Sequence, residues 1–142
     1  MIRAASGAAA ILSVTLGITG CGAASQNATV NNSAVYAAFA SGTSGVEVSA
    51  AGRVTRTLGM RTGRSGIHEG FLMRADGKPA LVVRVEDNVD LTGPIPLSEG
   101  ERVVVHGQYE YYPRGGVIHW THHDPAGRHP NGYIIVGGKT YQ

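Results

Sequence analysis

The chain has 142 residues and a formal net charge of +2, and its 12 basic and 10 acidic side chains are interspersed rather than grouped. Proteins that gain most of their affinity from nucleic-acid phosphates carry clustered lysine and arginine, so nucleic acid is not an expected partner. The single cysteine excludes an intramolecular disulfide, and one domain is the natural expectation for this length.

The first 20 residues have the features of a secretory signal peptide. A single early cation, Arg3, precedes an apolar stretch over residues 8–18 that is too short for a transmembrane helix. The segment Ile18-Thr19-Gly20-Cys21 resembles the lipobox of bacterial lipoproteins. This resemblance implies cleavage before Cys21 and acyl chains on that residue, which would anchor the protein to a membrane without spanning it.

The residues after Cys21 suggest where the protein resides and how it is tethered. Gly22 stands where an Asp would resemble the inner-membrane retention signal of enteric lipoproteins, so a Gram-negative host would place the protein on the outer membrane, facing the periplasm. Residues 21–45 carry no charge and are rich in Ala, Ser, Asn and Gly, a composition that predicts a flexible linker. Within it, residues 33–40 are compatible with a short helix.

From residue 46 to the end of the chain, apolar and polar residues alternate in short runs rich in Val, Ile, Tyr and Thr, a pattern typical of β-strands. Asp76-Gly77 and Pro113-Arg114-Gly115-Gly116 indicate hairpin turns, and two prolines make residues 91–100 a loop. The predicted strands are residues 46–58, 67–74, 80–85, 102–112, 116–122 and 133–136.

Five or six antiparallel strands in one small domain over residues 46–142 favour a closed barrel, because closure removes the exposed edges of a sheet. Gly52 and Gly59 give the long first strand two points at which to bend. The phrase Leu97-Ser98-Glu99-Gly100-Glu101-Arg102-Val103-Val104-Val105-His106-Gly107 is similar to the entry into a barrel strand of many OB-fold proteins. The sequence therefore predicts an all-β, antiparallel OB-like barrel, with a β-sandwich as the alternative.

The hairpin of residues 102–122 contains the candidate site. A four-residue loop over 113–116 predicts a register that pairs Glu110 with His119 and turns Ile118 and Trp120 toward the core. The orientation of His122 stays open because the strand ends near it. The polar face of the hairpin is the candidate ligand or metal face, with Gln108 opposite Thr121 and His106 opposite His123. It collects His106, Gln108, Glu110, Tyr112, His119, Thr121 and His123.

Directly opposed strand residues have Cβ atoms about 5 Å apart, so Glu110 with His119, or His106 with His123, has a spacing that suits a shared divalent transition metal such as zinc or manganese. His123 is the tentative third ligand. Asp90, Gln108, Thr121, Asp124 and His129 are candidate supporting residues. The alternative interpretation is a solvated outer face, with Glu110 and His119 as an ordinary charge pair and Asp124 as the cap of a turn.

Three segments together resemble a known family. They are Gly115-Gly116-Val117-Ile118-His119-Trp120-Thr121-His122-His123-Asp124-Pro125, Asn88-Val89-Asp90-Leu91 and Gly107-Gln108-Tyr109-Glu110. They are similar to segments of small exported bacterial proteins catalogued as a domain of unknown function. The resemblance spans residues 46–142 and implies an OB-like barrel, but it implies no activity.

Two functional hypotheses follow. The first is an envelope lipoprotein whose barrel binds a small ligand, a glycan or an envelope protein. The second is a metal-dependent hydrolase, phosphodiesterase-like or nuclease-like, in which Arg114 or Arg128 clamps a phosphate beside the histidines. The sequence contains no Gly-x-Ser-x-Gly elbow and no recognisable set of acid, base and nucleophile, which favours the binding module over the enzyme.

Overall fold

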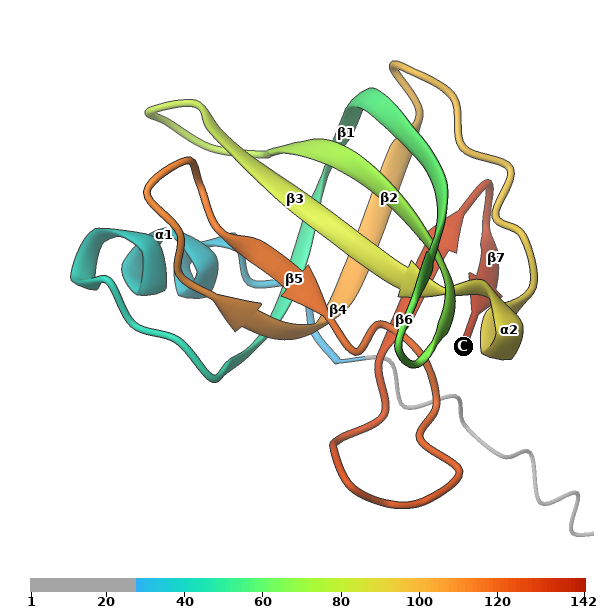
Figure 1. The fold of residues 1–142 in the computed structure, drawn as a ribbon. Helices are drawn as coiled ribbons and strands as arrows, with labels where there is room; N and C mark the ends of the chain where they lie inside the picture. The colour runs from blue at the N-terminus through green and yellow to red at the C-terminus, as the bar shows by residue number, and fades with distance from the viewer. Residues whose placement is uncertain (1–27) are drawn as a thin grey trace, which may run out of the picture.

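The computed structural model describes residues 28–142, which form a mostly β structure with two helices (Figure 1). The signal peptide, Cys21 and the first part of the predicted linker lie outside the described residues. In chain order the elements are α1 (Asn32–Ser41), β1 (Val46–Gly63), β2 (Gly66–Ala75), β3 (Leu81–Asn88), α2 (Val89–Thr92), β4 (Arg102–Glu110), β5 (Val117–His119), β6 (Tyr133–Val136) and β7 (Lys139–Tyr141).

Five strands close into a ring in the order β1-β2-β3-β5-β4, because β1 pairs with both β2 and β4. Strand β1 reaches both neighbours by coiling, and Gly52 is paired on both of its sides. A Cβ atom at Gly52 would lie 2.2 Å from the carbonyl oxygen of Arg74, so only glycine fits this crossing. The pairing of β1 with β2 shifts in register between Thr57 and Gly59, where Gly59 has a φ of 70°.

The observed strands match the predicted ones with shifted ends. Strand β6 has the predicted bounds, β1 continues to Gly63, and β5 ends at His119, three residues before the predicted end at residue 122. The prediction of a wholly antiparallel sheet is wrong, because β5 lies beside β3 in the parallel direction. Ring closure requires this parallel pair, because strands that alternate in direction around a ring of five leave one pair of neighbours that run the same way.

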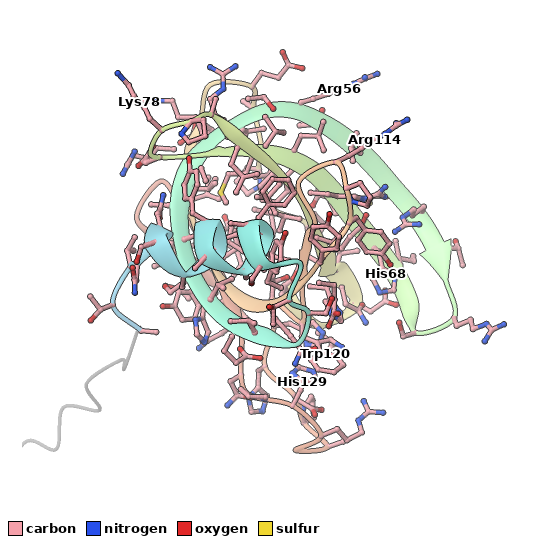
Figure 2. All side chains as sticks on the ribbon, turned by 90° about the vertical axis from the view of Figure 1, so that its left-hand side faces the viewer. Arg56, His68, Lys78, Arg114, Trp120 and His129 are labelled. Carbon is pink, nitrogen blue, oxygen red and sulfur yellow. The ribbon has the colours of Figure 1, made fainter. Side chains whose placement is uncertain are left out.

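Helix α1 lies across one open end of the ring (Figure 2). Its Val35 and Ala38 are buried in the core, and its Asn32 amide donates to the carbonyl oxygen of Ala51 at 2.7 Å and accepts from the Ala51 N–H at 2.8 Å. The prediction of a flexible linker is therefore wrong over this helix, because its apolar face closes the end of the ring. Neither helix of residues 28–142 is long and apolar enough to cross a membrane.

The core lies inside the ring and is built by alternation. In β4 every second residue from Val103 to Tyr109 is buried while the residues between them are partly exposed, as the period-two pattern predicts. The side chains that are almost completely buried are Val35, Val48, Val54, Phe71, Met73, Val83, Val85, Val103, Val105, Tyr109, Ile118 and Ile134.

One edge of β4 is shared by two strands. Its residues 108–110 pair with β5, and its residues 103–106 pair with β6. Between them residues 120–132, which we call the β5–β6 loop, leave the ring and project away from it (Figure 1). The loop has a narrow neck, since a Cβ atom at Gly132 would lie 1.9 Å from the carbonyl oxygen of Trp120.

Candidate functional site

The β4–β5 hairpin keeps the predicted faces but not the predicted register. Its connection covers residues 111–116 instead of 113–116, so the pairing is shifted by two residues. A shift of two preserves side-chain parity, and Nε2 of His119 still lies 3.5 Å from Oε1 of Glu110. The observed pairs are Gln108 with His119, Tyr109 with Ile118 and Glu110 with Val117.

Trp120 ends strand β5 and sets the start of the β5–β6 loop. It has a φ of 54°, in the left-handed region that side-chain-bearing residues rarely adopt. This turn ends the pairing with β4, so the predicted pairs of Gln108 with Thr121 and His106 with His123 are wrong. The prediction that Trp120 faces the core is also wrong, because the turn leaves its side chain 37% exposed.

A groove runs along the outer face of β2, β3 and β5, and it consists of two adjoining hollows. The first, which we call the histidine cleft, has a volume of about 550 Å³ and lies against the β5–β6 loop and α2. The second, the arginine cleft, has a volume of about 840 Å³ and extends toward the β4–β5 connection. The two hollows share His68, Glu86 and His119, which makes them one continuous groove.

The histidine cleft gathers chemistry from distant parts of the sequence. His68 comes from β2, His119 from β5, and His122 and His129 from the β5–β6 loop. The orientation of His122, which the sequence left open, is therefore toward the cleft. Asp90 of helix α2 lines the same cleft. The Trp120 ring stacks on the His129 ring with a centroid distance of 4.6 Å and an interplanar angle of 8°, and the two labelled rings lie side by side in Figure 2.

Hydrogen bonds to carbonyl oxygens define the tautomers of two of these imidazoles. Nδ1 of His122 lies 2.8 Å from the carbonyl oxygen of His123, and Nδ1 of His129 lies 2.8 Å from that of Pro130. A carbonyl oxygen only accepts, so each Nδ1 carries the proton and Nε2 holds the lone pair of the neutral ring. Nε2 of His129 is 3.8 Å from Oδ2 of Asp124.

Asp124 organises the β5–β6 loop from inside. Its buried carboxylate accepts from the backbone N–H groups of Ala126 at 2.9 Å, of His129 at 3.0 Å and of Arg128. Burial alone would raise the pKa of Asp124, but these backbone donors together with the nearby His129 hold that pKa below its ordinary value. The prediction that Asp124 caps a turn is confirmed. Asp124 supports the loop and does not line the groove.

The end of β3 buries a second aspartate behind the groove. Asp87 accepts hydrogen bonds from the hydroxyl of Thr121, at 2.7 Å, and from that of Thr92. Burial raises the pKa of Asp87. Burial also raises the pKa of Glu69, the cross-strand partner of Asp87, and the nearby Asp87 carboxylate raises that pKa further. Thr121 is therefore a buried link between the β5–β6 loop and β3 rather than a member of an exposed polar face.

Paired charges dominate the arginine cleft. The Glu86 side chain contacts Nη2 of Arg61 at 2.9 Å and the guanidinium of Arg84, although the residue is only 8% exposed. Arg114 and the 59% exposed Tyr112 lie on the β4–β5 connection and line the same cleft. The sequence reasoning did not select Glu86 or His68; the consecutive polar residues at the end of the buried β3 run were the signal available.

The remaining predicted site residues lie apart from the groove. The ring of His106 stacks on Tyr133 at 5.1 Å, and its Nε2 is 3.9 Å from Oε2 of Glu47, away from both clefts. Gln108 and the exposed His123 also line neither cleft. Within residues 28–142 no three His, Cys, Asp or Glu side chains are placed to share a metal ion, so the structure adds no support to His119, His123 and Glu110 as ligands.

The fold and the site together define a small β protein with a ring of five strands and a ligand-sized groove on its outer face. The chain belongs to the family described as "Protein of unknown function (DUF3465)", whose model matches residues 18–142. This match supports the resemblance to a domain of unknown function that the sequence motifs carry. No curated protein and no solved structure matches the chain.

Proposed function

We propose that this protein is an exported envelope lipoprotein whose ring is an OB-like barrel that acts as a binding module. The observation that carries the proposal is the continuous groove formed by the histidine and arginine clefts. It covers β2 and β3 and is bordered by the β1–β2 turn and the β4–β5 connection. OB-fold proteins bind oligonucleotides and oligosaccharides on this face, between these loops, and the order β1-β2-β3-β5-β4 agrees with that architecture.

Exposed aromatic side chains favour binding as the role of the groove. Trp120 is 37% exposed in the histidine cleft and Tyr112 is 59% exposed in the arginine cleft. A large aromatic ring exposed inside a groove gives a ligand an apolar face with a polar edge to contact. The groove therefore offers one aromatic surface in each cleft, with charged and polar groups between them.

Binding is testable through Trp120 because it is the only tryptophan of the chain. We expect its fluorescence to change when the purified protein is titrated with one of three envelope fractions, namely glycans, peptides or small molecules. Tyr112→Ala should weaken the response about tenfold, whereas His123→Ala, a change outside both clefts, should not alter it. If a folded protein responds to no fraction, the binding module is wrong.

The lipid anchor rests on the Ile18-Thr19-Gly20-Cys21 segment, and the family match includes it because that match begins at residue 18. We expect the wild-type protein to incorporate labelled palmitate and to sediment with membranes. Cys21→Ser should abolish both properties, because the thiol is the acylation site. Palmitate incorporation that persists in the variant would refute this anchor.

A metal-dependent hydrolase is the second candidate, and one observation favours it. Asp90 lines the same cleft as His119 and His122, so one cleft contains a carboxylate and imidazoles, and Oδ2 of Asp90 accepts from the Ile67 N–H at 2.9 Å. Elemental analysis of protein purified without a His tag separates the candidates. Near-stoichiometric zinc or manganese that His119→Ala removes would favour the hydrolase, whereas a metal-free protein that still binds its ligand would support the binding module.

A further inference from the structure

The charges of the groove nearly cancel. Four arginines line its two clefts, Arg61, Arg84, Arg114 and Arg128, against three carboxylates, Glu86, Asp90 and Glu110. Two of the arginines contact Glu86 directly, so much of the positive charge is already neutralised inside the protein. A groove that selects a polyanion concentrates charge of one sign, and this groove does not.

Strand β2, beneath the groove, has no free edge, because it pairs with β1 on one side and β3 on the other. Strand β5 pairs with β4 along its length and with β3 at Val117 and Ile118. A peptide that binds by adding a strand needs an open row of backbone N–H and C=O groups. Strand addition to β2 or to the paired part of β5 is therefore not the way this groove binds its ligand.

The two aromatic surfaces suit the apolar faces of sugar rings. Trp120 stacks on His129, which Asp124 positions through a backbone hydrogen bond at 3.0 Å. The His119 ring lies 4.7 Å from the Trp120 ring at 44°, so the exposed 37% of Trp120 is the part left for a ligand. An aromatic face is the negative part of the ring quadrupole and attracts the C–H groups on one side of a pyranose. Tyr112, in the arginine cleft, offers a second ring of this kind.

Between the two rings the groove presents donors and acceptors together. The guanidinium groups of Arg61 and Arg84 contact Glu86, and the His122 tautomer with its proton on Nδ1 leaves Nε2 as an acceptor. A sugar hydroxyl both donates and accepts, and neighbouring hydroxyls are spaced to meet such mixed partners. From these features we infer that the groove binds a neutral oligosaccharide, with one sugar against Trp120 and another near Tyr112. This inference rests on the proposed binding function.

Calorimetry with the purified full chain and defined oligosaccharides tests it. The probes are cellohexaose, maltohexaose and the hexamer of N-acetylglucosamine, compared with their dimers, with hexagalacturonate and with a single-stranded dodecathymidylate. We expect one neutral hexamer to bind at least about tenfold more tightly than its dimer, because only the hexamer spans both clefts. No binding of any neutral hexamer, or equal affinity of hexamer and dimer, would overturn the inference.

Matched variants localise the binding. Trp120→Ala should weaken hexamer binding by about tenfold or more, while Trp120→Phe keeps an aromatic face and should retain most of the affinity. Tyr112→Ala should weaken it about tenfold. Tyr111→Ala is the control, because Tyr111 is exposed but lines neither cleft and packs near Phe39 with a centroid distance of 5.8 Å.

The outcomes separate the two levels of the proposal. If hexagalacturonate or the oligonucleotide binds in a Tyr112-dependent manner and no neutral hexamer binds, the saccharide inference is wrong and the binding module stands. If no probe binds and Trp120 fluorescence also responds to no envelope fraction, both are wrong. Hexamer binding that all three alanine variants leave unchanged would place the saccharide elsewhere and overturn the inference.

Discussion

The end of strand β3 and the β5–β6 loop each bury an aspartate beside the histidine cleft, and the two carboxylates behave in opposite ways. Asp87 accepts from two hydroxyl groups and from the backbone N–H of Asn88, with His122 nearby, and burial still raises its pKa. Asp124 accepts from three backbone N–H groups, with His129 nearby, and despite its burial its pKa is lowered. Burial outweighs the favourable contacts of the charge at Asp87, whereas the contacts outweigh burial at Asp124.

This difference separates the two walls of the histidine cleft. The loop wall depends on an ionised Asp124, which holds the backbone that carries Arg128 and His129. The β3 wall tolerates an ionised Asp87 next to Glu69, whose negative charge lies across the strand pair. We expect substitutions in the two walls to have effects of different size and different pH dependence.

Asp124→Ala should have the largest effect. It leaves three backbone N–H groups of the loop without their acceptor, so the loop should lose its fixed conformation and Trp120 its stack on His129. We expect the largest fall in melting temperature among these variants, together with a red shift of the tryptophan fluorescence. His123→Ala, an exposed change in the same loop, is the control, and an equal effect of both variants would contradict the role of Asp124.

Thr121→Val should have an intermediate effect. The substitution keeps the shape of the side chain but removes the hydroxyl that donates to Asp87 at 2.7 Å, leaving a buried carboxylate with one donor fewer. We expect a loss of about 1–3 kcal/mol in the free energy of unfolding at neutral pH, measured by urea denaturation. Thr140→Val, at a partly exposed position in β7, should cost much less.

Both Asp87 and Asp124 should contribute to the pH dependence of the free energy of unfolding. Because the folded pKa of Asp87 is raised, the folded state binds its proton more tightly, and stability falls as pH rises from the ordinary value of 3.8 through the folded pKa. The folded pKa of Asp124 is lowered, so its contribution is lost as pH falls below 3.8. We expect maximal stability at mildly acidic pH, and urea midpoints that rise steadily from acidic to neutral pH would contradict this.

Asp87→Asn should have the smallest effect at neutral pH. The amide oxygen still accepts from Thr121, and the substitution removes a charge that burial disfavours. We expect the free energy of unfolding at pH 7 to be unchanged or slightly higher, and the loss of stability between mildly acidic and neutral pH to become shallower. A strongly destabilised variant would mean that the Asp87 carboxylate supports the fold after all.

The sequence predicted what depends on local alternation. The faces of β4, and the proximity of Glu110 to His119, survived a two-residue error in register because strand parity repeats every two residues. Trp120 was assigned to the wrong side because the end of β5 depends on a single backbone angle, a φ of 54°, that no pattern of residue types reveals.

The groove itself was out of reach of the sequence pattern. His68 and Glu86 lie on different strands from His119, and only the ring closure brings the three side chains to the boundary of the two clefts. Helix α1 was underestimated for a similar reason. Its Ala-rich composition resembles a spacer, and its role follows only from the open end of the ring that Val35 and Ala38 cover.

The shared edge of β4 has a consequence for how this protein can change over time. The β5–β6 loop leaves the sheet opposite Gln108 and rejoins it opposite His106, so both of its ends are anchored within one short stretch of a single strand. Insertions and deletions beyond the narrow neck at Gly132 do not alter the distance that the ring must close. Changes in the exposed part of the loop, away from Thr121 and Asp124, can therefore alter ligand preference while the ring of strands stays the same.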